Sequence, residues 1–253
     1  MNNNINFIGF NEDKEFLCKD FDTFDSEAKL RQMFLNLSNN ILKSICNFSK
    51  YEQRKLAKNS LKSAFIYKIN QLLPFSNLKQ SANNLSFKLC INSTKVINNY
   101  LNKEKKNMFF VSNTNLLPAA KLILHCYINN SIQVLIDKHL LFHEFVLYKV
   151  KKMHKDKEVI DLGDSISIKA KDICSLKIYT SWKSIDTKKL NIKDELTHAI
   201  KCIKEKEFNQ VYLAYPKYEG FTKHIPIIVD ELKNKEYQIK AIPYSLRSII
   251  RNK

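Results

Sequence analysis

The stretch SLKIYTSWKSIDTKKLNIKDELTHAIKCIKEKEFNQVYLAYPK, residues 175–217, decides the fold because its apolar period changes twice. Its first residues are rich in β-branched and aromatic side chains, which is typical of a strand. Asn191 can then cap a helix, and an apolar stripe at helical spacing follows it: Ile192, Leu196, Ala199, Ile200 and Ile203. The run VYLAYP barely alternates in polarity, which indicates a buried strand. The order strand, helix, strand is expected.

The flanking segments extend this pattern in both directions. Residues 140–153 are amphipathic and predict a helix, and VIDLGDSISIKA and ICSLKIYTSW predict two strands. Downstream, Thr222 can cap a long helix, and YQIKAIP predicts a final strand. The apolar residues of that helix would be Ile225, Ile228, Val229 and Leu232. Residues 140–253 are therefore expected to form an α/β domain with a small mixed sheet, ordered helix, strand, strand, helix, strand, helix, strand.

The first half of the chain has a different character. Residues 1–25 are rich in Asn and Asp and are predicted to be irregular. Helical periodicity predicts helices over residues 26–45, 51–73 and 94–102, and Pro118 can open another. Residues 26–130 are therefore expected to be a helical region, and the whole chain an α+β protein.

Composition bounds the function. The 253 residues carry 42 Lys and Arg against 25 Asp and Glu, a formal net charge of +17. Codon bias in an AT-rich genome raises Lys, but it raises Glu as well, so the surplus favours a phosphate-bearing partner, DNA or RNA. A basic regulatory or protein-interaction module without a nucleic-acid ligand remains the alternative.

Several function classes are disfavoured. The chain has three glycines and neither a GxxxxGK[ST] nor a GxGxxG motif, which argues against nucleotide hydrolysis and dinucleotide binding. No apolar run reaches the roughly 18 residues that span a bilayer, and the first residues lack the pattern of a signal peptide. We expect a cytoplasmic protein that does not bind membranes. Its six scattered cysteines are expected to be reduced and buried.

Basic and aromatic residues supply candidate contacts to nucleic acid. Arg54, Lys58 and Lys62 are four apart and would form a stripe if residues 51–73 are one helix. The alternative is a solvated helix face. The other candidates combine aromatic stacking with cationic contacts to phosphate, and they are Trp182, Lys183, Lys217, Arg247 and Arg251. For Trp182, Tyr215 and Tyr218, packing and base stacking both remain open.

The element order over residues 140–242, with SLKIYTSWKSIDTKKLNIKDELTHAI and FNQVYLAYPK, resembles the PD-(D/E)xK nuclease-like superfamily. The resemblance implies carboxylates that hold Mg²⁺ on the scissile phosphate and a lysine beside the attacking water. By resemblance, Glu144 would be the acid of the leading helix, and Asp161 or Asp164 the acid of the first strand. DLGD also has the composition of a simple turn around Gly163.

The strand LKIYT departs from the superfamily's E-x-K signature. Alignment puts Lys177 at the acid's position and Tyr179 at the lysine's position, and a lysine cannot ligate Mg²⁺. Lys169 or Lys177 would have to supply the lysine from elsewhere. We therefore expect nucleic-acid binding without cleavage and without a cofactor. The alternative is an active Mg²⁺-dependent endonuclease that uses Glu144, Asp161 or Asp164, and Lys177.

His139 and His143 share a helix face four residues apart. With Glu144 they read HxxxHE, which is not the HExxH order of zinc proteases. Histidines on a helix surface or satisfied within the core are expected there.

Overall fold

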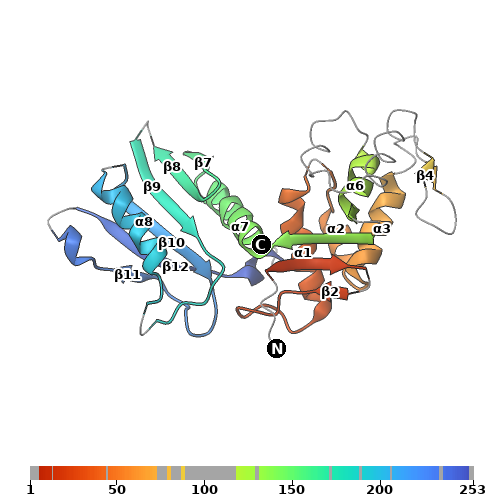
Figure 1. The fold of residues 1–253 in the computed structure, drawn as a ribbon, viewed down its shortest axis with the longest axis horizontal. Helices are drawn as coiled ribbons and strands as arrows, with labels where there is room; N and C mark the ends of the chain where they lie inside the picture. The colour runs from red at the N-terminus through yellow and green to blue at the C-terminus, as the bar shows by residue number, and fades with distance from the viewer. Residues whose placement is uncertain are drawn as a thin grey trace. The chain divides into compact units, whose positions relative to one another are not determined.

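The computed structural model describes residues 6–12, 14–43, 45–72, 79–80, 87–88, 118–128, 131–170, 173–187, 190–205, 207–233 and 236–250 (Figure 1). The chain divides into two compact units. The N-terminal unit comprises Met1–Cys18 and Phe24–Asp137, and the C-terminal unit comprises Lys19–Thr23 and Lys138–Lys253. In the described residues, no helix is both long and apolar enough to cross a membrane.

A four-stranded sheet of order β2-β1-β6-β5 forms part of the N-terminal unit. Its strands are β1 (Phe7–Asn11), β2 (Lys14–Phe16), β5 (Tyr127–Ile128) and β6 (Ser131–Asp137). β1 pairs antiparallel with β6, which lies more than a hundred residues later in the chain. The prediction that residues 1–25 are irregular is therefore wrong for β1 and β2, because a distant strand supplies the hydrogen bonds that order them.

The described helices of the N-terminal unit are α1 (Glu27–Ile41), α2 (Lys50–Leu56), α3 (Leu61–Leu72) and α6 (Pro118–Cys126), and a short β3 (Lys79–Gln80) pairs with β4 (Phe87–Lys88). The single helix predicted over residues 51–73 is two helices. Ser49 and Glu52 form a capping box that starts α2, and the Glu15 carboxylate accepts the Leu61 N–H at the start of α3. Pro118 opens α6 as predicted, whereas the helix predicted over residues 94–102 lies outside the described residues.

The C-terminal unit contains a six-stranded mixed sheet of order β11-β12-β10-β9-β8-β7. Its strands are β7 (Glu158–Asp161), β8 (Ser165–Ala170), β9 (Ile173–Thr180), β10 (Gln210–Pro216), β11 (Ile225–Ile227) and β12 (Gln238–Tyr244). β10 runs parallel to β9 and β12, and the other pairs are antiparallel. The predicted mixed sheet in an α+β protein is confirmed.

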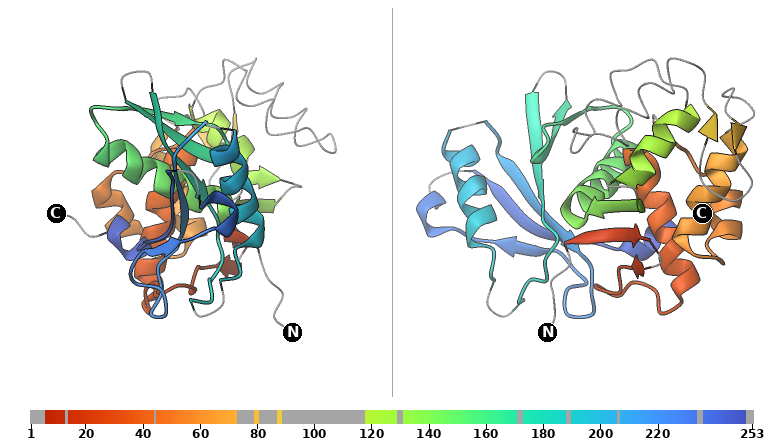
Figure 2. Two further views of the ribbon diagram at one scale, coloured as in Figure 1. Left: turned by 90° about the vertical axis from the view of Figure 1, so that its left-hand side faces the viewer. Right: turned by 45° about the vertical axis from the view of Figure 1, so that its right-hand side comes forward.

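Two helices cover opposite faces of this sheet (Figure 2). α7 (Lys138–Met153) bonds Thr180 of β9 through His143. α8 (Lys193–Lys204) packs its Ala199 and Ile203 in one apolar cluster with Val211 and Leu213 of β10. Because neighbouring strand residues point to opposite faces, Lys177 and Tyr179 lie on the α8 side with their β10 partners Val211 and Leu213.

Two details of the predicted element order are wrong. VIDLGDSISIKA is two strands, because Gly163 adopts a φ of 85° and turns the chain between β7 and β8. α8 starts at Lys193 with Ile192 as its N-cap, while the side chain of Asn191 accepts the Asp186 N–H.

The long helix predicted after Thr222 is also absent from the described chain there. β11 and a 3-10 turn (Asp230–Leu232) occupy this segment, and a second 3-10 turn spans Leu246–Ile249. Ile227 and Val229 are buried while Ile228 is 83% exposed, so the burial follows the period of a strand. The edge of the sheet offered by β12 decides the structure here, and Pro226 is tolerated because β11 is itself an edge strand.

Residues 19–23 belong to the C-terminal unit although they precede α1. Phe21 stacks edge-on against Trp182, with ring centroids 5.3 Å apart, and contacts Tyr218 at 6.4 Å. Phe21 and Asp22 adopt φ values of 57° and 46°, in the left-handed region. The Arg247 Nε–H donates to the Thr23 carbonyl at 2.9 Å. We call residues 19–23 the strap.

Candidate functional site

The candidate site brings together side chains from α7, β7 and β9. His143 is buried on α7, and its two ring nitrogens lie 3.0 Å from Thr180 Oγ1 and 3.0 Å from Asp161 Oδ1. The same Asp161 oxygen accepts the Gly163 N–H at 2.9 Å. His143 therefore joins the helix to two strands of the sheet. Oδ1 of Asp161 is already engaged in two hydrogen bonds.

The carboxyls of Asp161 and Glu144 differ in their electrostatics. Partial burial acts to raise the pKa of Asp161, but the Gly163 and His143 hydrogen bonds outweigh it, so this pKa lies below its ordinary value. Burial, and then the negative charge of Asp161, raise the pKa of Glu144. Lys151 lies on the same face of α7 as Glu144. Its positive charge acts to lower the pKa values of both Glu144 and Asp161 and so stabilises both carboxylates.

Asp164 and Lys177 do not join this group. Asp164 accepts the Ser165 hydroxyl at 2.7 Å. Burial and the Cys202 thiol raise the pKa of Tyr179, on the α8 side of the sheet, and the charge of Asp164 adds to this rise. Lys177 lies on that side too, with its Nζ 5.3 Å from the Tyr179 ring centroid and 5.4 Å from that of Phe208. The structure thus brings Glu144 and Asp161 together and separates them from Lys177.

The remaining lysine candidate is no better placed. Lys169 pairs with Glu158 at the opposite end of the β7–β8 hairpin from Asp161. In the part of the chain that the structure describes, no three His, Cys, Asp or Glu side chains are grouped to hold a metal ion. A Mg²⁺ ion shared by Glu144, Asp161 and Asp164 does not fit this arrangement, because Asp164 turns away and His143 holds Asp161.

The expected basic stripe is interrupted. Arg54 lies in the last turn of α2, Lys58 in the connection and Lys62 in the first turn of α3, so the three do not share one helix face. Arg54 and Lys58 are exposed and Lys62 is half-buried. The break between the helices, which the apolar pattern does not reveal, separates them.

Trp182 and its neighbours serve packing. The Trp182 side chain is 8% exposed, between the rings of Phe21 and Phe142. Lys183 is bonded to Glu195 at 2.7 Å and to the Asn191 carbonyl at 2.9 Å. Base stacking on Trp182 would require removal of the strap, so packing is its role in this structure.

The other aromatic and basic candidates are more varied. Tyr215 is fully buried, and the half-buried Tyr218 donates its hydroxyl to the Ile185 carbonyl. Lys217 is half-buried, and Arg247 is bonded to the strap. Arg251 lies outside the described residues. Of the described cysteines, Cys18, Cys46, Cys126 and Cys202 are free and buried, as predicted.

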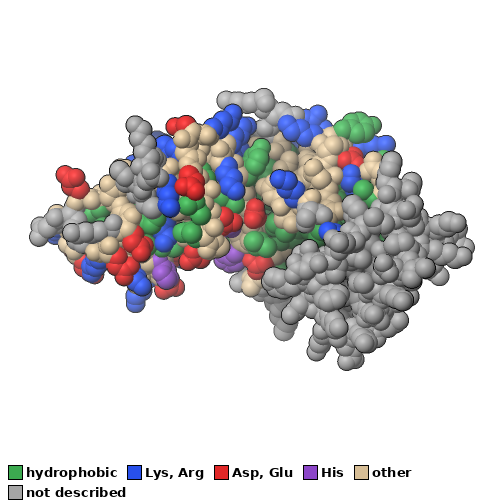
Figure 3. Space-filling model, turned by 90° about the horizontal axis from the view of Figure 1, so that it is seen from above, with side chains coloured by type: hydrophobic (Ala, Val, Ile, Leu, Met, Phe, Trp, Pro, Cys, Tyr) green, Lys and Arg blue, Asp and Glu red, His purple; other side chains and the backbone are tan. Residues whose placement is uncertain are grey.

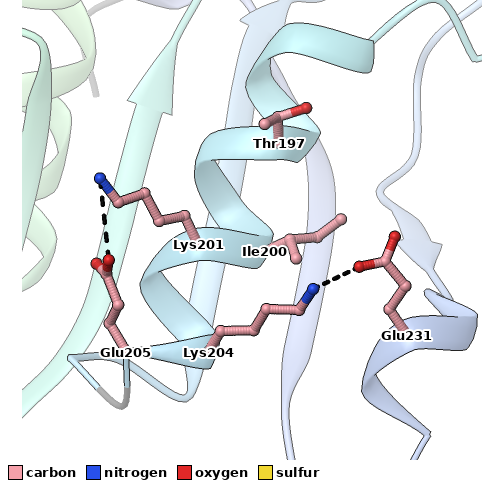
Figure 4. Close-up of a pocket in the computed structure, with 6 residues that line it drawn as sticks. All are labelled: Thr197, Ile200, Lys201, Lys204, Glu205 and Glu231. Carbon is pink, nitrogen blue, oxygen red and sulfur yellow. Dashed lines mark hydrogen bonds and ion pairs between the residues drawn. The ribbon is translucent and has the colours of Figure 1, made fainter.

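Charges of both signs are mixed on one face of the described part of the molecule. On the face seen in Figure 3, Lys and Arg side chains are interspersed with Asp and Glu side chains. A cavity of about 370 Å³ lies on the outer side of α8, against Glu231 of the 3-10 turn. The charged side chains that line this cavity are paired with one another, Lys204 with Glu231 and Lys201 with Glu205 (Figure 4).

Sequence reasoning missed Lys151 and its neighbour Tyr148. Glu144, Tyr148, Lys151 and Lys155 follow one another at steps of four, three and four, which places them on one face of α7. That spacing can be recognised from the sequence alone. The electrostatic contact of Lys151 with Asp161 cannot, because it depends on how β7 lies against the helix.

Comparison with known proteins shows a fold and no family. No protein-family model matches the chain, and no curated protein matches it. A chain in the solved tetradecameric assembly of Thermococcus gammatolerans McrB AAA+ hexamers with bound McrC is similar, with a TM-score of 0.59 and 9% sequence identity. The match covers 97% of this chain and 81% of that chain. At this identity the likeness concerns the fold alone.

Proposed function

We propose that this protein binds nucleic acid, in the cytoplasm, through a nuclease-like core that does not cleave. The absence of cleavage is supported by the position of His143. A metal-dependent nuclease needs its acids free to ligate the ion and a lysine beside them, whereas here His143 and Gly163 bond Asp161 and Lys177 lies across the sheet. The net charge of +17 supports the proposed binding of nucleic acid.

Binding is tested by titrating the protein into labelled single-stranded DNA, duplex DNA and RNA, with fluorescence anisotropy as the readout. We expect affinity to fall steeply with salt, because each neutralised phosphate releases counterions and contributes about −0.7 to −0.9 to the slope of log K against log salt. No detectable binding of any of the three at low salt would remove the proposal.

Cleavage is tested separately with Mg²⁺ and Mn²⁺. We expect no nicking or cutting of the bound substrates by the unmodified protein. Cleavage that disappears in both Glu144→Ala and Asp161→Ala would make the protein an active nuclease centred on this pair. Cleavage that Asp164→Ala alone abolishes would place the acids on the other side of the sheet.

A protein-interaction module is the second candidate. It is favoured by the fold likeness, which extends over almost the whole chain to a component of a protein assembly. The two candidates differ in salt response and ligand. A module of this kind would leave all three nucleic acids unbound and would form a stable complex with a protein partner instead.

A further inference from the structure

We infer that the solvent face of α7 is a binding surface for single-stranded nucleic acid, with a base stacked on Tyr148 and phosphates held by Lys151, Lys152 and Lys155. This inference rests on the proposed function and gives it a location. It names the class of ligand, an unpaired strand, that the side chains on this face fit.

The geometry of α7 sets these residues together. The helix buries Leu141, Phe142, Phe145, Val146 and Val150 completely, which leaves one stripe facing solvent. Tyr148 is 48% exposed on that stripe, and Lys151 and Lys152 follow it by three and four residues. Side chains at these spacings are neighbours on a helix surface. A half-exposed aromatic ring therefore lies beside two cations.

The lysines of this stripe are available to a ligand. Lys151, Lys152 and Lys155 are exposed, and in the described part of the chain none of them forms an ion pair. Other lysines of the same unit do pair with acids, at 2.7 Å for Lys183 and 2.5 Å for Lys204. Lys152 and Lys155 thus keep their charge for something outside the chain, whereas Lys151 shares its charge with the carboxylates of Glu144 and Asp161.

The cations also crowd one another. Burial, and then the positive charge of Lys152, lower the pKa of the Lys149 ammonium. Lysines in the last turn of a helix complement its dipole, which accounts for Lys151 and Lys152. The dipole does not account for Lys155, beyond the helix, or for the exposed Tyr148. A single strand accounts for all four residues, because its phosphates match the three lysines and a base matches Tyr148.

The exposed ring selects for an unpaired strand. Bases stack on aromatic side chains when they are free of a partner strand, and one such contact contributes about 1–3 kcal/mol. A duplex hides its base faces and would use the lysines alone. The charge of Lys151 acts on the carboxylates of Glu144 and Asp161, so a strand bound on this face passes these two acids. Lys151 offsets the repulsion that these carboxylates exert on phosphate.

The test compares variants of the full chain against a labelled oligothymidylate and a duplex of equal length. Tyr148→Ala should weaken binding of the single strand by roughly 5- to 100-fold, while Tyr148→Phe retains the ring and binds as the unmodified protein does. Duplex affinity should be equal in both variants. Circular dichroism and thermal melting verify that each variant is folded.

A charge-matched pair of triple variants tests the lysines. Lys151→Gln with Lys152→Gln and Lys155→Gln should reduce the salt slope for the single strand by about 2, three phosphates at about 0.7 each. The control removes the same charge from exposed lysines elsewhere in the C-terminal unit, namely Lys19, Lys193 and Lys223, and should leave the slope nearly unchanged.

The outcomes separate the two proposals. If the unmodified protein binds but both triple variants lose affinity equally, or if Tyr148→Ala binds the single strand normally, the α7 surface is wrong and nucleic-acid binding stands. If the unmodified protein binds nothing, the proposed function itself fails, and this inference fails with it.

Discussion

His143 changes what a single carboxylate can do. By resemblance, Asp161 was expected to ligate a metal ion, but its Oδ1 accepts hydrogen bonds from His143 and from Gly163 N–H. These bonds stabilise the ionised carboxylate, which is why the pKa of Asp161 falls despite partial burial. The residue works here as a structural link between α7 and the β7–β8 turn.

The lowered pKa of Asp161 predicts a pH dependence. The folded protein holds this proton less tightly than the unfolded chain does, so the stabilisation is present above the ordinary value of 3.8 and is lost as pH falls through the folded value. Asp161→Asn should therefore lower the melting temperature at neutral pH, with the difference shrinking below pH 3.8. The effect is small because 38% of the side chain is exposed. A constant difference at all pH values would contradict this reasoning.

The Glu52–Lys68 pair supports the N-terminal unit. Lys68 Nζ lies 2.8 Å from Glu52 Oε1, and both side chains are 11% exposed. Burial acts to raise the pKa of Glu52, but the hydrogen bonds from Lys68 and Ser49 outweigh it, so this pKa lies below its ordinary value. The carboxylate also accepts the Ser49 N–H that starts α2.

Lys68→Met should destabilise the protein by about 3–5 kcal/mol, because it leaves a buried carboxylate without its cation. Urea unfolding measures the change. Lys58→Met, at an exposed position, is the matched control and should have an effect within about 0.5 kcal/mol. Equal effects from the two variants would show that the buried pair contributes nothing.

At the scale of the elements, β1 depends on a glycine. Gly9 pairs with Leu135 of β6 at a φ of 139°, and a Cβ atom there would lie 1.9 Å from the Val134 carbonyl oxygen. Only a residue without a side chain permits this approach of the two strands.

Gly9→Ala should therefore separate β1 from β6 and destabilise the N-terminal unit severely. Gly163→Ala is the control, because Gly163 also has a positive φ but has nothing within 4 Å of its would-be Cβ. It should cost only about 1–2 kcal/mol of backbone strain. Thermal melts of the two variants make the comparison, and a milder effect at Gly9 than at Gly163 would refute it.

Elements with a long, consistent apolar period were predictable. The stripe of α8 and the apolar run of β10 were both recognised, because each stretch meets its core along its whole length. Short elements were not. Residues 222–232 show helical spacing of apolar residues, yet β12 offers an unpaired edge that β11 fills. Pairing with β12 therefore outweighs the local helical pattern in this segment.

At the scale of the whole molecule, the chain enters the C-terminal unit twice. The strap, residues 19–23, packs Phe21 against Trp182 and Tyr218, more than 150 residues later in the chain. Without this contact one edge of the Trp182 ring would meet water. The strap makes the fold of the C-terminal unit depend on residues that precede α1.

Phe21→Ala should shift the fluorescence of Trp182 to longer wavelength, since the ring loses its apolar neighbour. The measurement is direct because the chain contains a single tryptophan. Phe21→Ala should also destabilise the unit, by less than the roughly 3–5 kcal/mol lost when a fully buried Phe is truncated, because Phe21 is only half-buried. Ile228→Ala, at an 83% exposed side chain, should change neither. An unaltered emission spectrum in Phe21→Ala would mean that the strap does not cover Trp182 in solution.

The sequence by itself determined the α+β class, the course of α7, α8 and β10, the buried cysteines and the basic charge, because composition and local periodicity carry these properties. Only the tertiary structure decided that His143 lies between Asp161 and Thr180, that Lys177 faces α8, and that Phe21 covers Trp182. Each of these contacts joins residues far apart in the chain. They depend on strand register and on turn positions, and a shift of one residue in a strand moves every side chain to the other face.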